Sequence, residues 1–320
     1  MKLLKRFGIL LALLIIILLS IGCIYQNSKS KKDVKNYHPV GSIYEIKNKK
    51  MHIYTGGNGD ATVVFAAGWG TVNPYIDFYP LYDGVSKFAK FAVYDRFGYG
   101  YSDFTDEKRD VDSVVDEVHE LLIKSEQRPP YILVGHSLAS VETIRFAQKY
   151  KDEVKGIVLI DGGNPEMYAS QKPATFIASF QRQLIKFGIA RILYNTEGFA
   201  DSVNSERNNL KLIPEELKEV DKISTLLRGS NRNIIDEMRM SQENAKKVCE
   251  GDKLGSIPLT IITAGSFEKQ NSDWLESQKK LKEWSENSKQ FVVENAQHYI
   301  HQYKPDIIIK EIEEIAKKMK

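Results

Sequence analysis

The sequence of 320 residues predicts an α/β protein with a mostly parallel central sheet, flanking helices and an inserted helical cap. Short apolar runs rich in β-branched residues alternate with helical stretches along most of the chain. One long, charged, helical stretch interrupts this alternation, and strand-like runs resume after it. Alternation of this kind is typical of parallel strands joined by crossover helices. The interruption is best explained as a cap inserted over the carboxyl edge of the sheet.

The first element, residues 1–25, is expected to be a membrane anchor or a signal. Three basic residues among the first six positions precede an almost wholly apolar run from Phe7 to Tyr25, roughly the 20 residues that a membrane-spanning helix needs. The run exceeds the apolar core of roughly 7 to 15 residues that a cleaved signal usually has, and no A-x-A-like site follows. We interpret it as an uncleaved anchor. A cleaved signal and lipidation at Cys23 are the alternatives.

Residues 26–40 are polar and rich in lysine, and we expect them to form a short solvated tether. Basic residues flank the apolar run on both sides, so they orient it only weakly. By the default for a leading anchor, we expect a single-pass protein of the cell membrane whose main domain is extracytoplasmic.

The sheet domain is expected over residues 41–161 and 256–320, and the cap over residues 162–255. Six buried strands are predicted, at residues 61–66, 88–94, 131–134, 154–160, 259–263 and 290–293. Between strands, valines and leucines from Val111 to Leu122 fall on one helical stripe, which indicates a helix packed on the sheet.

Charge and cysteine content exclude several classes of protein. The 45 basic and 42 acidic residues give a net charge of +3, which is too balanced to indicate a nucleic-acid partner. Cys23 and Cys249 are the only cysteines, so neither a disulfide framework nor a zinc-type cysteine spacing is present. The sequence does not specify an oligomeric state.

The strongest functional signal is a serine at a sharp turn between a strand and a helix. The apolar run from Tyr131 to Val134 enters Gly135-His136-Ser137-Leu138-Ala139 and continues as a helix. This is the context of a nucleophile elbow, in which a strained turn projects the serine hydroxyl. Gly135 and Ala139 meet the need for small side chains two positions away, although glycine is usual at the second place. We predict that Ser137 is a nucleophile; a serine that caps an ordinary helix is the alternative.

A glycine-rich loop follows the strand at residues 61–66 and reads Ala67-Gly68-Trp69-Gly70. We expect the backbone N–H groups of Trp69 and Leu138 to converge as an oxyanion hole. Each such donor is typically worth roughly 10²–10³-fold in rate. A merely structural loop is the alternative.

The candidate general base is His298, in the loop between the last strand and the C-terminal helix. That loop lies at the carboxyl edge of the sheet, where Ser137 is also expected. The other histidines precede the sheet, lie on a helix face or sit within the elbow and the start of the last helix. His298 is therefore the best placed to accept the serine proton.

The acid that would orient this histidine is less clearly marked. In this architecture the chain order is serine, acid, histidine. Asp161 directly follows the strand at residues 154–160, and Glu268 follows the strand at residues 259–263. We predict that Asp161 is the acid and place Glu268 next. A carboxylate that only orders the cap hinge is the alternative for Asp161.

The elbow, the His298 loop and the run from Asp95 to Asp103 together resemble α/β-hydrolases with an N-terminal membrane helix from Gram-positive bacteria. The resemblance covers nearly everything after about Asn36, although the cap matches only loosely. It implies the α/β-hydrolase fold, a Ser-His-acid triad and a cap, and it supplies no substrate.

We therefore expect a serine hydrolase that cleaves an ester or related small acyl compound through an acyl-enzyme. This chemistry needs no metal and no organic cofactor. Ser137 excludes a haloalkane dehalogenase, which needs an aspartate at the elbow, whereas an aminopeptidase and a cofactor-free haloperoxidase stay open. The alternative from another class is a catalytically inactive hydrolase-fold module that binds a partner at the membrane surface.

Overall fold

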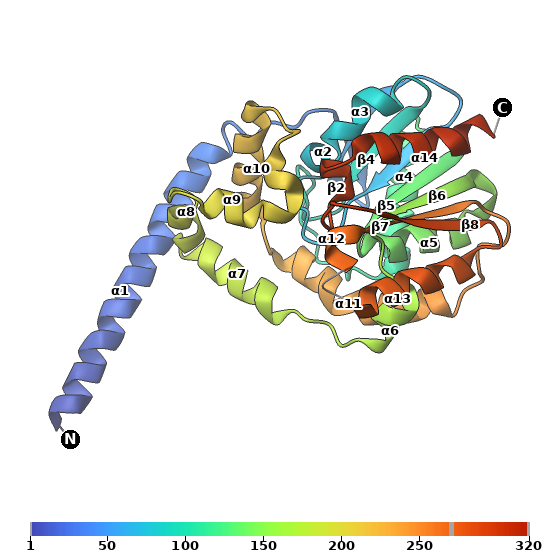
Figure 1. Cartoon of the computed structure of the whole chain (residues 1–320). Coiled ribbons are helices and arrows are strands. Elements are labelled where there is room, and N and C mark those ends of the chain that lie inside the picture. Colours follow the sequence, from blue (N-terminus) through green and yellow to red (C-terminus); the bar gives the residue numbers. More distant parts are fainter. Residues whose placement is uncertain (1, 269–271, 319–320) are drawn as a thin grey trace.

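A computed structural model describes residues 2–268 and 272–318 of the chain. Its centre is an eight-stranded sheet in the order β1-β2-β4-β3-β5-β6-β7-β8 (Figure 1). β1 and β2 pair antiparallel with each other, β2 pairs antiparallel with β4, and the other neighbours pair parallel. The strands are β1 (Ser42–Ile46), β2 (Lys49–Gly57), β3 (Thr62–Ala66), β4 (Lys90–Asp95), β5 (Tyr131–His136), β6 (Val154–Ile160), β7 (Leu259–Ala264) and β8 (Ser288–Val293).

Helices cover both faces of the sheet. The helices that join or follow strands are α2 (Pro74–Asp77), α3 (Tyr79–Val85), α4 (Val111–Lys124), α5 (Ala139–Lys149), α12 (Gly265–Glu268), α13 (Ser272–Leu281) and α14 (Pro305–Lys317). Short 3₁₀ turns lie at Lys151–Glu153, Lys282–Trp284 and Ile300–Gln302. One apolar cluster packs α4 and α5 on one face of the sheet, and a second packs α2, α3 and α14 on the other. Both faces of the parallel strands are therefore buried, as the apolar runs predict.

Side chains along β6 point alternately to the two faces of the sheet and pack into both apolar clusters. Ile157 and Leu159 belong to the cluster under α4 and α5, whereas Val158 and Ile160 belong to the cluster under α14. The predicted helical stripe from Val111 to Leu122 is buried in the same way on α4. The predicted α/β architecture with a central, mostly parallel sheet is confirmed.

Between β6 and β7 the chain forms helices and no strand. These are α6 (Pro165–Ser170), α7 (Phe176–Lys186), α8 (Ile189–Leu193), α9 (Phe199–Val203), a 3₁₀ stretch (Ser205–Leu210), α10 (Glu215–Arg228) and α11 (Arg232–Cys249). The insertion leaves the sheet at the carboxyl end of β6 and returns to the amino end of β7. Figure 1 shows α7 to α10 lying to one side of the sheet domain, next to α1.

The N-terminal helix is longer than the apolar run. α1 extends over Lys2–Asp33, so the residues expected to begin a solvated tether are helical up to Asp33. The polar end of α1 packs on the cap, and the Gln26 side chain is buried there. Residues 26–33 are thus helical and Gln26 contacts the cap, whereas Asn27, Ser28, Lys29, Lys31 and Lys32 are exposed to solvent. The apolar part of α1 projects from the body (Figure 1).

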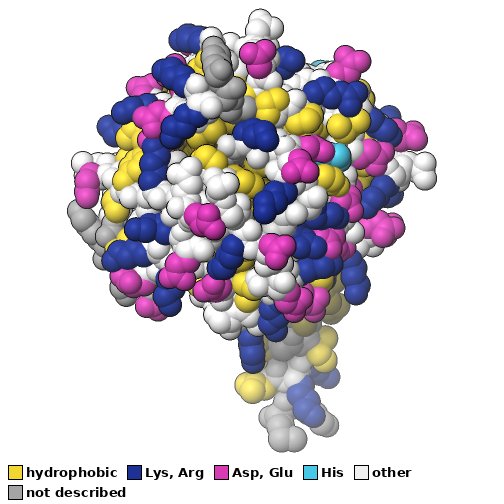
Figure 2. All heavy atoms as spheres, turned by 90° about the vertical axis from the view of Figure 1, so that its right-hand side faces the viewer, with side chains coloured by type: hydrophobic (Ala, Val, Ile, Leu, Met, Phe, Trp, Pro, Cys, Tyr) yellow, Lys and Arg dark blue, Asp and Glu magenta, His cyan; other side chains and the backbone are white. Residues whose placement is uncertain are grey.

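The first two strands, β1 and β2, are absent from the six predicted strands. They form an antiparallel hairpin at the edge of the sheet, and Lys47 and Asn48 make its turn with positive φ values of 48° and 61°. β1 is the mostly exposed edge strand, and β2, which pairs with both β1 and β4, buries only its middle; neither has the continuous apolar run that marks a central parallel strand. At the other edge of the sheet lies β8. Figure 2 views the molecule from the right-hand side of Figure 1, where basic and acidic side chains are interspersed over the surface.

Candidate active site

Ser137 lies at the turn between β5 and α5, with a φ of +55°. Its N–H donates to the Ile160 carbonyl at 3.1 Å, and its own carbonyl accepts from the Gly163 N–H at 3.2 Å. Gly135 is needed because a Cβ there would lie 2.4 Å from Thr143 Oγ1. The turn thus has the strained backbone of an elbow, and buried neighbours hold it in place.

The His298 ring lies between Ser137 and Asp161. Its Nε2 is 2.8 Å from Ser137 Oγ, and its Nδ1 is 2.5 Å from Asp161 Oδ2. Three side chains from three separate loops, each at the carboxyl end of a strand, therefore form one hydrogen-bonded chain. A hydroxyl, an imidazole and a carboxylate in this order can transfer a proton from the hydroxyl to the imidazole.

Asp161 follows β6 directly and has a φ of +42°. Its side chain is fully buried, and its Oδ1 accepts from the Ala264 N–H at 3.0 Å, Trp274 Nε1 at 3.3 Å and Gln278 Nε2 at 2.7 Å. Three donors to one oxygen leave Oδ2 directed at His298. Glu268, the other predicted acid, is the last residue of α12, and its side chain lies outside the described part of the structure.

The predicted oxyanion loop passes directly over the elbow. A Cβ on Gly68 would lie 2.7 Å from His136 Nδ1 and 3.2 Å from Ser137 Cβ, so only glycine permits this approach. Trp69 follows Gly68, and its indole Nε1 donates to the Ile234 carbonyl of α11 at 2.7 Å. The loop is therefore fixed on both sides, by the elbow below and by the cap above.

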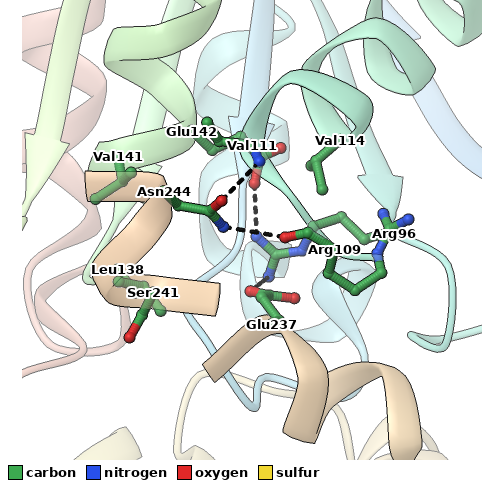
Figure 3. A pocket seen from close by; sticks show the side chains of 10 residues that line it. All are labelled: Arg96, Arg109, Val111, Val114, Leu138, Val141, Glu142, Glu237, Ser241 and Asn244. Carbon is green, nitrogen blue, oxygen red and sulfur yellow. Dashed lines mark hydrogen bonds and ion pairs between the residues drawn. The ribbon is translucent and has the colours of Figure 1, made fainter. Parts of the chain in front are cut away.

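Arg96 anchors the same loop from within the protein. Its Nη2 donates to the carbonyls of Ala67 at 2.9 Å and Gly68 at 3.3 Å, and its Nη1 donates to Glu142 at 2.7 Å. Glu237 of α11 lies 3.4 Å from Arg96 Nη2. Burial raises the pKa of Glu237, and the nearby Arg96 opposes that rise. Figure 3 shows this buried polar cluster, to which both the sheet domain and α11 contribute.

A cavity of about 650 Å³ lies in front of Ser137 and His298. The loop at Gly68–Val72 forms part of its wall, and cap helices form most of the rest. Apolar side chains of the cap that line it are Leu184, Ile185, Leu193, Phe199 and Val203. Among the described residues, no group of three or more His, Cys, Asp or Glu side chains is arranged to hold a metal ion. The cavity suits a largely apolar small molecule next to the serine.

Tyr168 of α6 is a site residue that the sequence did not reveal. It lines the cavity beside Ser137, burial raises the pKa of its phenol, and a hydrogen bond with Ser137 opposes that rise. The phenol is therefore neutral and able to donate at neutral pH. A lone tyrosine in a helical insertion carries no motif, so only the folding of the cap identifies it. Trp274 and Gln278, on α13 of the sheet domain, were missed because no sequence motif links them to Asp161.

His136, inside the elbow, is fully buried behind the loop. Burial together with the neighbouring His298 and His301 lowers the pKa of His136 well below its usual range. Its Nε2 lies 3.1 Å from the His298 carbonyl, so a neutral His136 that donates there fixes the His298 loop. The position between glycine and serine in the elbow thus supports the candidate base.

Comparison with known proteins identifies the fold family. Residues 61–305 match the family model described as alpha/beta hydrolase fold. The chain therefore belongs to the α/β-hydrolase fold family, which confirms the fold part of the resemblance.

The chain is similar over its whole length to a bacterial protein and, in fold, to several solved structures. The uncharacterized protein YbdG of Bacillus subtilis (strain 168) is 29% identical over 327 residues, which span 100% of this chain and 98% of YbdG. The Cif epoxide hydrolase from Acinetobacter nosocomialis superposes with a TM-score of 0.69 at 14% identity, covering 92% of this chain and 96% of that one. An esterase (EaEST) from Exiguobacterium antarcticum gives a TM-score of 0.64 at 14% identity, with 87% and 100% covered. At such identities the structural likeness shows the fold alone.

Proposed function

We propose that the protein is a membrane-tethered serine hydrolase that cleaves an ester or a related acyl compound. The observation that carries the proposal is the hydrogen-bonded chain from Ser137 Oγ through His298 to the buried Asp161 carboxylate. A positive φ at the serine supports it, because a strained turn is retained where it presents a reactive group.

In the proposed reaction, Ser137 Oγ attacks the carbonyl carbon of the substrate while His298 Nε2 takes the hydroxyl proton. The Nδ1–H of His298 donates to Asp161, which stabilises the imidazolium that forms. The tetrahedral intermediate collapses to an acyl-enzyme when His298 returns the proton to the leaving group. Water then attacks the acyl-enzyme while His298 takes a proton from that water. The bond between the acyl carbon and Ser137 Oγ breaks as His298 returns the proton to Oγ, which releases the acid product and restores Ser137.

Negative charge develops on the former carbonyl oxygen in both steps. We assign its stabilisation to the backbone N–H groups of Trp69 and Leu138. The close approach of Gly68 to Ser137 supports this assignment, since it places the loop next to the reacting atom. Tyr168 is a further donor beside Ser137, available to the substrate or to the leaving group.

The tether is assigned to α1. Its segment from Leu3 to Asp33 is long and apolar enough to cross a membrane, and a signal sequence would have the same character. The long cap-contacting end of α1 supports retention, because a cleaved segment would leave those contacts unmade. Full-length protein is expected to sediment with membranes and to resist salt extraction. A mature chain that lacks α1 would contradict the tether and leave the hydrolase proposal untouched.

A fluorophosphonate probe tests the activity most simply, because it labels only an activated serine. The full chain is expected to label at Ser137, and Ser137→Ala is expected to abolish both labelling and esterase activity. Ser202→Ala, an exposed serine of α9, is the matched control and should label normally. Absence of labelling in well-folded wild-type protein would contradict the proposal and favour an inactive binding module.

A further inference from the structure

The cap exposes a group of large apolar side chains beside α1. On α7 the relative exposures are 81% for Phe176, 64% for Ile177 and 55% for Phe180, and on α8 Ile192 is 56% exposed. The three α7 residues share one stripe of the helix, so they form a surface rather than scattered contacts. An exposed apolar surface of this kind usually marks a partner or a membrane.

Contacts with α1 fix the position of this surface. Gly22 of α1 lies so close to the end of α7 that a Cβ there would be only 2.2 Å from the Phe187 carbonyl oxygen. Further along α1, Gln26 donates to the Leu226 carbonyl of α10 at 3.0 Å and accepts from Arg191 Nε of α8 at 2.8 Å. The cap helices and α1 are therefore joined by close packing and by buried polar contacts.

The position of these contacts along α1 indicates where the cap lies relative to a membrane. The apolar run of α1, from Phe7 to Tyr25, ends just beyond Gly22, and its roughly 20 helical residues span about 30 Å, the thickness of the hydrocarbon core. If α1 crosses a bilayer, the junction of α7 and α8 lies where the helix leaves the lipid. The exposed apolar stripe then sits at the membrane surface.

The charges on α7 agree with this position. The helix carries Arg182 and Lys186 on its polar side, both exposed, and contains no acidic residue. An apolar stripe with phenylalanine beside a basic polar side is typical of a helix that lies in the headgroup region. The face of the sheet domain in Figure 2 differs, because acidic and basic side chains alternate there. Basic residues next to lipid also attract anionic headgroups.

We propose that the exposed apolar stripe of α7, together with Ile192 of α8, docks on the bilayer that holds α1, and that the enzyme takes its acyl substrate from that lipid. The proposal rests on the tether and on the hydrolase activity proposed above. Leu184, one turn after Phe180 on the same stripe of α7, lines the cavity that contains Ser137. The stripe that would face the lipid therefore continues into the wall of the cavity, which favours a lipid-borne acyl ester as the substrate class.

Depth-dependent quenching tests the docking without any need for catalysis. Full-length protein carrying Cys23→Ser and Cys249→Ser is labelled with an environment-sensitive fluorophore at Phe180→Cys and reconstituted into phosphatidylcholine–phosphatidylglycerol vesicles. The control position is Lys310→Cys, exposed on α14 far from α1 (Figure 1). With brominated lipid, the fluorophore at position 180 should lose roughly half of its emission, because interfacial helices bury their apolar side about 5–10 Å deep. The fluorophore at position 310 should be unaffected.

If brominated lipid quenches the fluorophores at positions 180 and 310 to the same extent, the docking surface is contradicted. A spectral change at position 180 that depends on protein concentration and not on brominated lipid would also overturn it, since it would assign the surface to a second copy of the chain.

An activity measurement addresses the substrate class. Replacing both Phe176→Ser and Phe180→Ser should lower the rate on a long-chain acyl ester embedded in vesicles by about tenfold, because the apolar contact with lipid is lost. Hydrolysis of a water-soluble short-chain ester by the same variant should be unchanged. Equal effects on the two esters would contradict lipid supply. If the wild type cleaves neither ester, the hydrolase proposal fails while the quenching result still decides the docking.

Discussion

The carboxyl edge of the sheet and the wall of the cap hold their side chains by different means. At the sheet edge, Asp161 is fully buried and accepts three hydrogen bonds through one oxygen, so the carboxylate has one orientation toward His298. The cap wall of the cavity consists mainly of apolar side chains on short helices, such as Leu184 on α7. Directional bonds are suited to fixing reacting atoms, whereas apolar packing sets only the shape of a cavity.

This difference separates two kinds of mutational effect. Changes at the sheet edge should lower kcat for every substrate, because the same atoms react whatever the acyl group is. Changes in the cap wall should alter selectivity between acyl groups and leave the short substrates unaffected.

The largest effect is expected for His298→Ala. Loss of the base should lower kcat by roughly 10⁴-fold or more, since members of a triad act as a unit. The loss should be the same for short and long acyl esters, as steady-state kinetics on both would show. A loss confined to one ester would mean that His298 shapes the pocket rather than the reaction.

Arg96→Met should have an intermediate effect, because Arg96 holds the carbonyls of the proposed oxyanion loop. If the loop shifts, its N–H group no longer points at the reacting oxygen, and kcat should fall by roughly 10- to 100-fold. This loss is smaller than the roughly 10²–10³-fold loss expected when one oxyanion-hole donor is removed completely. Removing a buried arginine also destabilises the fold, by about 3–5 kcal/mol, because its acidic partners lose their countercharge.

Arg109→Met is the matched control for that loss of stability. Arg109 is equally buried and paired with Glu117 at 2.7 Å, but its guanidinium bonds that carboxylate instead of the loop. Both variants should melt at lower temperature, and only Arg96→Met should lose kcat in the folded fraction. Equal kcat values for the two variants would remove Arg96 from any role in positioning the loop.

The smallest and most selective effect is expected in the cap. Leu184→Trp fills part of the cavity and should lower kcat/KM for long acyl chains by about tenfold while leaving short chains nearly unchanged. Glu243→Trp, exposed on α11, adds the same side chain away from the cavity and should change neither. A uniform loss across chain lengths for Leu184→Trp would show that the cap also positions the reacting groups.

The difference between the sheet edge and the cap also explains which features could be predicted from the sequence. The six predicted strands appear because each is a short, mostly apolar run, and the positions of Ser137 and His298 after strands follow from them. Asp161 was harder to choose, since its donors Trp274 and Gln278 lie more than 100 residues further along the chain. No local pattern links residues that only the packed sheet brings together.

The cap was predicted as helical but not in detail. Helices α6 to α9 are short, and what the cap helices touch depends on how the insertion folds back over the sheet. Neither Tyr168 beside Ser137 nor the contact of Gly22 with α7 has a signature in the sequence. The helical conformation of residues 26–33 was missed for a related reason, because a lysine-rich segment resembles a linker unless its packing partner is known.

The most direct test of the central claim compares the two carboxylates. Asp161→Asn and Glu268→Gln each remove one charge with little change in volume, and kcat with a soluble ester is measured for both. Asp161→Asn should lower kcat by up to roughly 10⁴-fold without unfolding the protein, because the histidine loses its working tautomer, and Glu268→Gln should stay close to the wild type. Near wild-type activity of Asp161→Asn together with collapse of Glu268→Gln would contradict the account and move the acid to the loop after β7.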